Sequence, residues 1–244
     1  MAGIILNGSV IKGLMLNGSS VSAMLNGVKV FPREEPGPDP YNPLGLPPNT
    51  VRVRTNDGNA PTKGESTTYE TATLVAGTTD VYDVYKSGTD FGFFLYSSTN
   101  ISEVLGANTT SVTNMRYMFS FCTSLETAQL FDTSSVTSIN SMFRGCTLLE
   151  TIPLFDTSNV TDMMYVFNGC SSLTFLPLFN TSKATNMTYF ASNCYKVQTG
   201  ALAIYQQAST QTNPPTSHTG TFVNCGRDTT TGAAELAQIP SNWK

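Results

Sequence analysis

Hydrophobic and polar positions in the second half of the chain recur at a fixed interval of 24 residues. Successive copies read NTTSVTNMRYMFSFCTSLETAQLF, DTSSVTSINSMFRGCTLLETIPLF, DTSNVTDMMYVFNGCSSLTFLPLF and NTSKATNMTYFASNCYKVQTGALAIY. A degenerate copy follows around Phe222–Cys225. Self-similarity at a period of about 20 to 50 residues is typical of a solenoid, in which neighbouring copies share one core and the terminal copy forms a cap.

Two periodicities follow one another within each copy. In the third copy apolar residues recur every three or four positions, at Val160, Met163, Val166 or Phe167, and Cys170, which indicates one face of a short helix. The pattern L-x-x-L-x-L comes next, from Leu173 to Leu178, and matches the strand of a leucine-rich repeat. Each copy is therefore predicted to be a helix followed by a strand.

Positions that are apolar in every copy predict a shared structural core. Its expected members are Cys122, Cys146, Cys170, Cys194, Phe119, Phe143, Phe167, Leu125, Leu149 and Leu173. Three interpretations of the cysteines are open: a packed column of free thiols, disulfides, or a metal site. We favour free thiols, because stacked side chains point in parallel and the chain has no C-x-x-C or Cys/His spacing.

Polar columns accompany the apolar ones. Each copy opens on a residue that can form an Asx turn, with a calcium-binding ladder as the alternative; these residues are Asn108, Asp132, Asp156 and Asn180. The turn is favoured, because two of the four side chains are amides. A threonine near the start of each predicted helix is expected to cap it, at Thr113, Thr137, Thr161 and Thr185.

The N-terminal segment, residues 1–31, has a repeat of its own. Asn-Gly pairs stand at positions 7, 17 and 26, flanked by apolar residues, and predict hairpins that form a small β-meander. Such a small sheet has too little core to be stable alone, so it should attach to a partner or oligomerise. The residues expected to mediate attachment are Ile4, Leu6, Val10, Leu14, Leu16, Val21, Leu25, Val28 and Val30.

Three further segments complete the predicted organisation. Residues 32–48 contain seven prolines and form a semi-rigid linker. Residues 49–106 form a small β-domain or an N-terminal cap, with strands expected at Val51–Arg54, Tyr69–Val75, Val81–Tyr85 and Phe91–Tyr96. Residues 107–244 form the leucine-rich-repeat-like solenoid with its C-terminal cap. The predicted fold class is therefore an α+β repeat.

Composition narrows the range of partners. A net charge of -4, with only 12% charged residues, argues against a nucleic-acid partner, which needs clustered basic side chains. The chain lacks an apolar run of about 18 residues, so membrane insertion is not expected. The N-terminus does not resemble a secretory leader, and the odd number of cysteines fits reduced thiols, so we expect synthesis in a cytoplasm.

Catalytic motifs are not evident. Asp80, Asp83 and Asp90 are scattered carboxylates, and His218 is the single histidine. We therefore expect no enzyme activity, no catalytic residue, no metal and no cofactor. Outward positions on the predicted strands instead form a possible binding face, comprising Thr127, Gln129, Thr151, Thr174 and Phe175, because an exposed aromatic among polar side chains suits recognition.

The third copy, from Phe155 to Leu176, resembles the BspA-type leucine-rich repeat, typified by F-D-T-S-N-V-T-D-M-x-x-M-F-x-G-C-x-S-L-x-x-L. The similarity covers about residues 108–205. The L-N-G-x-x-V series at the N-terminus resembles short modules of phage and prophage structural proteins. The C-terminal stretch from Ala201 to Lys244 is similar to the C-termini of proteins from gut phages.

These resemblances imply a non-enzymatic phage virion structural protein, either a head or tail fibre or a capsid decoration protein. They imply synthesis in the host bacterial cytoplasm and a final location on the virion surface. Residues 1–31 would attach to other virion proteins, and a homo-oligomer is expected, with a trimer favoured. The solenoid would be displayed for adhesion to a host-surface glycan or protein. One alternative is a bacterial cell-surface adhesin. Another is a glycan hydrolase, which is less favoured because the sequence offers no motif for a catalytic carboxylate pair.

Overall fold

The computed structural model describes residues 4–6, 9–11, 23–25, 28–30 and 39–244. The chain divides into two compact units, Met1–Asp39 and Pro40–Lys244. In the first unit β1 (Ile4–Leu6) pairs antiparallel with β2 (Ser9–Ile11), and β3 (Ala23–Leu25) pairs antiparallel with β4 (Val28–Val30). The described strands form two separate two-stranded sheets. The described strands therefore form two hairpins and not the predicted single β-meander, and the three Asn-Gly pairs lie outside the described residues.

The proposed attachment residues fall unevenly on these hairpins. The members that lie in described strands are Ile4, Leu6, Val10, Leu25, Val28 and Val30. Leu14, Leu16 and Val21 lie outside the described residues. Residues 32–38 of the predicted linker lie outside them as well. From the rest of that linker, Leu46 is buried in the second unit, where its carbonyl accepts from the side-chain amides of Asn42 and Asn108.

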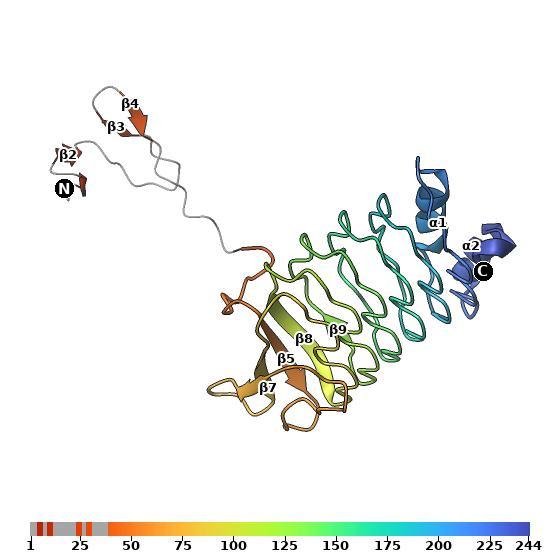
Figure 1. The fold of residues 1–244 in the computed structure, drawn as a ribbon, viewed down its shortest axis with the longest axis horizontal. Helices are drawn as coiled ribbons and strands as arrows, with labels where there is room; N and C mark the ends of the chain where they lie inside the picture. Colours follow the sequence, from red (N-terminus) through yellow and green to blue (C-terminus); the bar gives the residue numbers. More distant parts are fainter. Residues whose placement is uncertain (1–3, 7–8, 12–22, 26–27, 31–38) are drawn as a thin grey trace. The chain divides into compact units, whose positions relative to one another are not determined.

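The second unit begins with a five-stranded mixed sheet in the order β6-β7-β5-β8-β9 (Figure 1). Its strands are β5 (Thr50–Thr55), β6 (Thr71–Leu74), β7 (Val81–Tyr85), β8 (Ile101–Asn108) and β9 (Thr127–Ala128). All neighbours pair antiparallel except β8 and β9, which are parallel. The parallel pairing connects the sheet to the repeats, because Thr127 of β9 also forms a bridge with Thr151 of the next coil.

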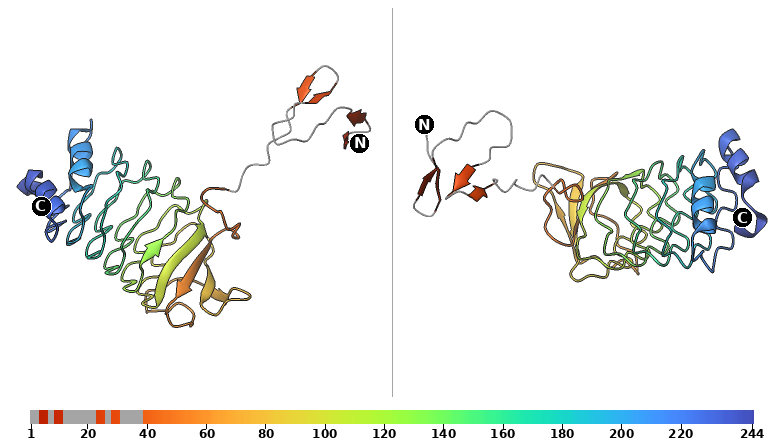
Figure 2. Two further views of the ribbon diagram at one scale, coloured as in Figure 1. Left: turned by 180° about the vertical axis from the view of Figure 1, so that it is seen from behind. Right: turned by 90° about the horizontal axis from the view of Figure 1, so that it is seen from above.

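The repeats stack as coils beyond β9, side by side in a row that ends at the C-terminal helices (Figures 1 and 2). Isolated parallel bridges join equivalent positions of successive coils, as in Thr127 with Thr151 and Phe175 with Thr199. A second column of bridges joins Asp90, Asn114, Ser138, Asp162, Asn186 and Ser217. Each coil therefore contributes very short extended segments instead of full strands.

The segments predicted as helices are runs of consecutive turns. In the coil that contains Cys122, the amides of Tyr117 and Phe119 donate to the carbonyls of Asn140 and Met142 in the next coil, at 2.8 and 2.9 Å. The intervening amides close turns within the coil; the amide of Cys122, for example, donates to the Phe119 carbonyl at 3.1 Å. An α-helix would direct these amides along its own axis. Here half of them connect neighbouring coils instead.

Left-handed residues explain why the periodicity resembled that of a helix. Two residues in each run, four positions apart, have positive φ, as in Tyr117 (56°) and Phe121 (60°), and again in Tyr165 (57°) and Gly169 (79°). This conformation ends a right-handed helix. Because the turns repeat every four residues, the inward side chains recur at the three- and four-residue spacing of a helix.

The predicted α+β repeat was therefore wrong. The second unit is built mainly from the mixed sheet and from turns, and the described α-helices are α1 (Ala201–Thr210) and α2 (Thr230–Gln238), followed by a 3-10 turn, η1 (Ser241–Trp243). All three lie at the C-terminal end of the coil stack (Figure 1).

The conformation of Phe91–Tyr96 and the start of the repeats also differ from the prediction. Phe91–Tyr96 is the first turn run instead of a strand, since the amides of Phe91 and Leu95 each donate at 2.8 Å to carbonyls of the following coil. The alternation of apolar residues in that stretch suggested a strand, but Phe91 and Leu95 stand 24 residues before Met115 and Phe119 of the next coil. The repeats therefore begin earlier than expected, and β8 was not foreseen.

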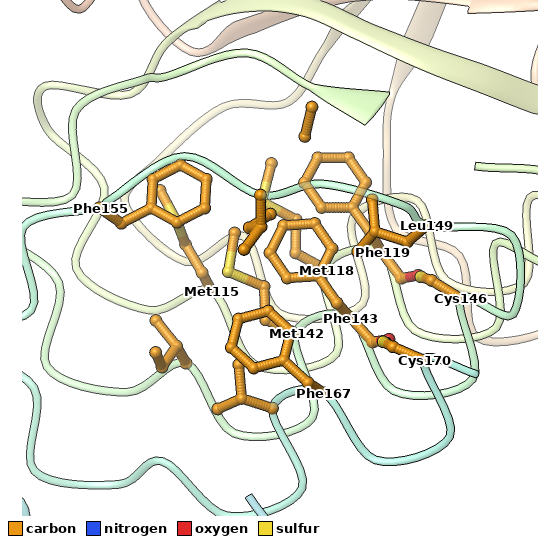
Figure 3. Close-up of a cluster of buried hydrophobic side chains, with 14 of the residues drawn as sticks. Met115, Met118, Phe119, Met142, Phe143, Cys146, Leu149, Phe155, Phe167 and Cys170 are labelled. Atoms are coloured by element: carbon orange, nitrogen blue, oxygen red, sulfur yellow. The ribbon is translucent and has the colours of Figure 1, made fainter. Parts of the chain in front are cut away.

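Aromatic stacking fills the centre of the coils. The Phe119 and Phe143 ring centroids lie 5.5 Å apart, and those of Phe143 and Phe167 lie 5.9 Å apart, with near-parallel planes (Figure 3). A second column passes through Phe131 and Phe155, whose centroids are 4.7 Å apart. One hydrophobic cluster runs from the sheet to the C-terminus, so the sheet and the coils share a single core.

A substitution at Gly145 tests the turn geometry. Gly145 has φ of 72°, and a Cβ there would lie 2.6 Å from Cδ1 of Phe121. Gly145→Ala should therefore cost about 1 to 2 kcal/mol for the left-handed backbone and roughly 1 to 3 kcal/mol more for the clash. Gly88→Ala is the control, with φ of 79° and nothing within 4 Å of the added Cβ. Urea unfolding of both variants gives the comparison; equal losses of stability would contradict the packing of Phe121 on Gly145.

Candidate binding surface

The expected binding-face residues lie on one column of the coils and beside it. Thr127, Thr151 and Phe175 occupy equivalent positions of successive coils. Thr151 and Gln129 are exposed and Phe175 is 49% exposed, whereas Thr127 and Thr174 are half-buried. The Thr174 hydroxyl donates to the Glu150 carbonyl at 3.2 Å, so it serves the contact between coils.

Two exposed leucines accompany Phe175: Leu178 follows it by three residues, and Leu154 holds the position of Leu178 in the preceding coil. Leu154 is 57% exposed and Leu178 is 51% exposed. We call Leu154, Phe175 and Leu178 the apolar patch. Single exposed apolar residues are ordinary, but a group of large ones on neighbouring coils is typical of an interaction site.

Sequence reasoning missed the leucines of the apolar patch because it assigned Leu178 to the inward face of a regular strand. The amide of Phe179 donates to the carbonyl of Pro177 at 2.8 Å, which closes a three-residue turn. That turn breaks the alternation, so that Phe179 is buried and Leu178 is exposed. The signal available in the sequence was Pro177, since proline in a strand indicates an edge or a bend.

The cysteine column is fully buried and consists of free thiols. Four of the sulfurs, all but that of Cys225, reach a backbone carbonyl of the preceding coil: Sγ of Cys146 lies 3.1 Å from the Phe119 oxygen, and Sγ of Cys170 lies 3.1 Å from the Phe143 oxygen. Burial raises the pKa of Cys122 to about 12 and raises the pKa values of the other four cysteines well above the usual range. The thiols therefore act as packing groups and weak donors.

The remaining core candidates surround this column. Phe119, Phe143, Phe167, Leu125, Leu149 and Leu173 are all buried. Among residues 39–244 and the four short strands before them, no three histidine, cysteine or acidic side chains are grouped as metal ligands.

Side-chain ladders hold the corners of the coils. The predicted Asx turns are present at three of the four positions, since Oδ1 of Asp132, Asp156 and Asn180 each accepts, at 2.9 Å, from the amide two residues later. At the fourth position Oδ1 of Asn108 accepts instead from the Thr110 hydroxyl, at 3.2 Å. The helix-capping role expected for the threonines was wrong, because the coils contain no helix there. Instead, the Thr137 hydroxyl donates to the Thr113 carbonyl at 3.3 Å, and Thr161 repeats this contact with Thr137.

Comparison with known proteins shows a similarity between the coils and a described family. Residues 89–203 match the model of a family described as "Mycoplasma protein of unknown function, DUF285". The match begins at the first turn run and ends just inside α1, so it covers the coils that precede α1. It agrees with the resemblance at the level of this family and carries no information on leucine-rich repeats or phages. The chain matches no curated protein and no solved structure.

A search of the described residues for spanning helices gave a negative result. None of their helices is both long enough and apolar enough to cross a membrane.

The buried thiols predict a specific pH response. Because burial raises their pKa above the ordinary value of 9.0, folding favours the protonated thiols, and the stability is lost as pH rises from about 9 toward 12. Replacing one cysteine, as in Cys146→Ala, should reduce the slope of unfolding free energy against pH by up to about 1.4 kcal/mol per pH unit. Urea unfolding at several pH values measures the slope.

A thiol reagent provides the matching control. Ellman's reagent at pH 8 should modify none of the five cysteines in the folded protein and all five after denaturation. Rapid modification of the folded protein would contradict the burial of the column.

Proposed function

We propose that this chain is a non-enzymatic display protein of a phage virion, a fibre or a decoration protein, in which the coils present a binding surface. The apolar patch is the observation that carries the proposal. Leu154, Phe175 and Leu178 are about half exposed on a unit that has a complete core of its own. Exposed aliphatic and aromatic side chains on a rigid support favour a protein partner, because burying them in an interface releases ordered water.

The N-terminal hairpins support the attachment role. Residues 1–39 form a unit separate from the coils, and their described strands pair only two at a time. A two-stranded hairpin is marginal alone in water, and its free edges can accept another strand. Strand addition to other virion proteins, or to further copies of this chain, would complete these sheets.

A bacterial cell-surface adhesin is the second candidate. The description of the matching family names Mycoplasma proteins, which favours a bacterial protein. On this alternative the apolar patch has the same adhesive role, and the N-terminal hairpins attach to a component of the cell envelope. The two candidate functions place the protein in different locations, but both use the apolar patch as the binding surface.

Oligomeric state tests the hairpins. Light scattering should give a trimer for the full chain and a monomer for residues 40–244, because the removed strands have free edges that symmetry mates can pair with. The cut falls at the boundary between the two units, so the coils should keep their unfolding midpoint. A full-length monomer would remove the support for self-assembly through the hairpins.

Particle labelling tests the setting and the patch together. An antibody against residues 40–244 should label phage particles from a host that carries the gene, and deletion of residues 1–39 should abolish the labelling. The triple variant Leu154→Ser, Phe175→Ser, Leu178→Ser should still be incorporated, but the adhesion of the particles should fall by about tenfold or more. Label on the cell envelope and not on particles would favour the adhesin. Unchanged adhesion of the variant particles would exclude the patch.

A further inference from the structure

A second surface is formed by the turn runs. We call the segments 92–97, 116–121, 140–145, 164–169, 188–193 and 219–224 the turn face. Half-buried aromatic side chains recur on it, at the left-handed positions and next to them. The aromatic residues of this set are Phe93, Tyr96, Tyr117, Phe121, Tyr165 and Tyr189.

Flat groups stack on one another along the turn face. The rings of Phe93 and Tyr117 lie 4.6 Å apart with planes 11° from parallel, and those of Tyr165 and Tyr189 lie 5.2 Å apart with planes 10° from parallel. The coil between these two pairs has Ser141 at the equivalent position and offers no ring there.

Arg144 bridges this interruption. Its guanidinium carbon lies 5.5 Å from the centroid of the Phe121 ring and 4.8 Å from that of Tyr165. At the far end of the column a Cβ on Gly220 would lie 2.4 Å from Cε1 of Tyr189, so the backbone closes over that ring. The ring faces are therefore largely covered, and the ring edges are what solvent meets.

The charges of the turn face are unlike those of the whole chain. Although the protein carries -4 overall, the segments of the turn face contain Arg116 and Arg144 and no acidic residue. The ion pairs among the described residues involve Arg52, Arg54 and Arg227. Among the described residues, the guanidinium groups of Arg116 and Arg144 make only ring contacts, and that of Arg116 lies 5.8 Å from the Tyr117 centroid.

Two carboxylates border the turn face, and each accepts hydrogen bonds from neighbouring amides. Asp90 accepts at 2.9 Å from the side-chain amide of Asn114, and Asp162 accepts at 2.9 Å from that of Asn140. Each also accepts from a backbone amide two residues later, those of Gly92 and Met164. Neither forms an ion pair with the two arginines within the described residues.

Covered faces and exposed edges determine which ligands fit. An aromatic ring has a negative face and a positive edge, so stacked rings that show their edges attract anionic oxygens, as do the two guanidinium groups. The Tyr117, Tyr165 and Tyr189 hydroxyls have no hydrogen-bond partner among the described residues and can bond ligand hydroxyl groups. Single-stranded nucleic acid fits poorly, since its bases need free ring faces and its phosphates need more cations.

We propose that the turn face binds an acidic polysaccharide, with Arg116 and Arg144 pairing its carboxylates and the tyrosine hydroxyls bonding its sugar hydroxyls. Successive coils repeat at the strand spacing of about 4.8 Å, so an extended chain of sugars can lie along several of them. This inference goes beyond the proposed function, because it concerns a different surface and requires neither the virion setting nor the apolar patch.

Native electrophoresis of the full chain through gels containing polygalacturonate tests the proposal. The protein should be retarded at low salt and released as salt rises, and fully methyl-esterified polygalacturonate, which lacks the charge, should not retard it. Arg144→Gln and Arg116→Gln should each weaken retardation by about tenfold. Tyr165→Phe keeps the ring stack and should weaken it by a few-fold.

Arg227→Gln is the matched control, because Arg227 also stacks on a tyrosine, with its guanidinium carbon 4.4 Å from the Tyr195 centroid, and lies outside the turn face. It should bind as the parent does. If Arg144→Gln loses its cooperative thermal transition, the retardation of Arg116→Gln alone tests the proposal, because Arg116 is exposed. Three results would each overturn the proposal. The first is equal retardation by the methyl ester and by polygalacturonate, and the second is a loss of retardation in Arg227→Gln as large as in the turn-face variants. The third is stronger retardation by oligothymidylate than by polygalacturonate. Binding that survives loss of the apolar patch separates this result from the proposed function.

Discussion

Backbone hydrogen bonds that run from one coil to the next across the turn face set the geometry of residues 89–225. Alternate amides in each run donate forward to carbonyls of the following coil, as Phe143 does to Val166 at 3.0 Å. The remaining amides close turns within the coil. This division satisfies the backbone without helices or long strands, and it aligns each coil with its neighbour at the 24-residue interval. The thiol, threonine and phenylalanine columns all follow from that alignment.

Maintaining those bonds requires a strained backbone. Tyr117, Tyr165 and Tyr189 have φ between 52° and 57°, a conformation that bulky residues rarely adopt. Each such residue costs of the order of 1 kcal/mol. Stacking of the same rings against neighbouring coils, at 4.6 to 5.2 Å, offsets part of this cost. The aromatic column therefore stabilises the turn runs whether or not it also binds a ligand.

The repeat separates the residues that hold the coils together from those that meet a partner. Buried positions, such as Cys146 and Phe143, are nearly invariant between coils, because every coil packs on an almost identical neighbour. Outward positions vary: the column of Thr127 and Thr151 carries Phe175 in the coil that contains Cys170. The apolar patch and the turn face use different segments of the coil, so the same stack can offer two surfaces of different chemistry.

The 24-residue interval, the identity of the buried columns and the Asx turns could all be read from the sequence. The conformation of the segment around Val160–Cys170 could not, because inward positions three and four apart arise equally from a helix and from turns with left-handed residues. Only the hydrogen bonds to the next coil decide between them, and these join residues more than 20 positions apart. The same holds for the candidate surfaces. Phe175 was predicted to be exposed, but Leu178 turns outward through a local turn, and Arg144 meets Tyr165 only when the coils stack. Sequence alone determined what repeats and what is buried, whereas contacts between coils decided the backbone conformation and which side chains gather on a surface.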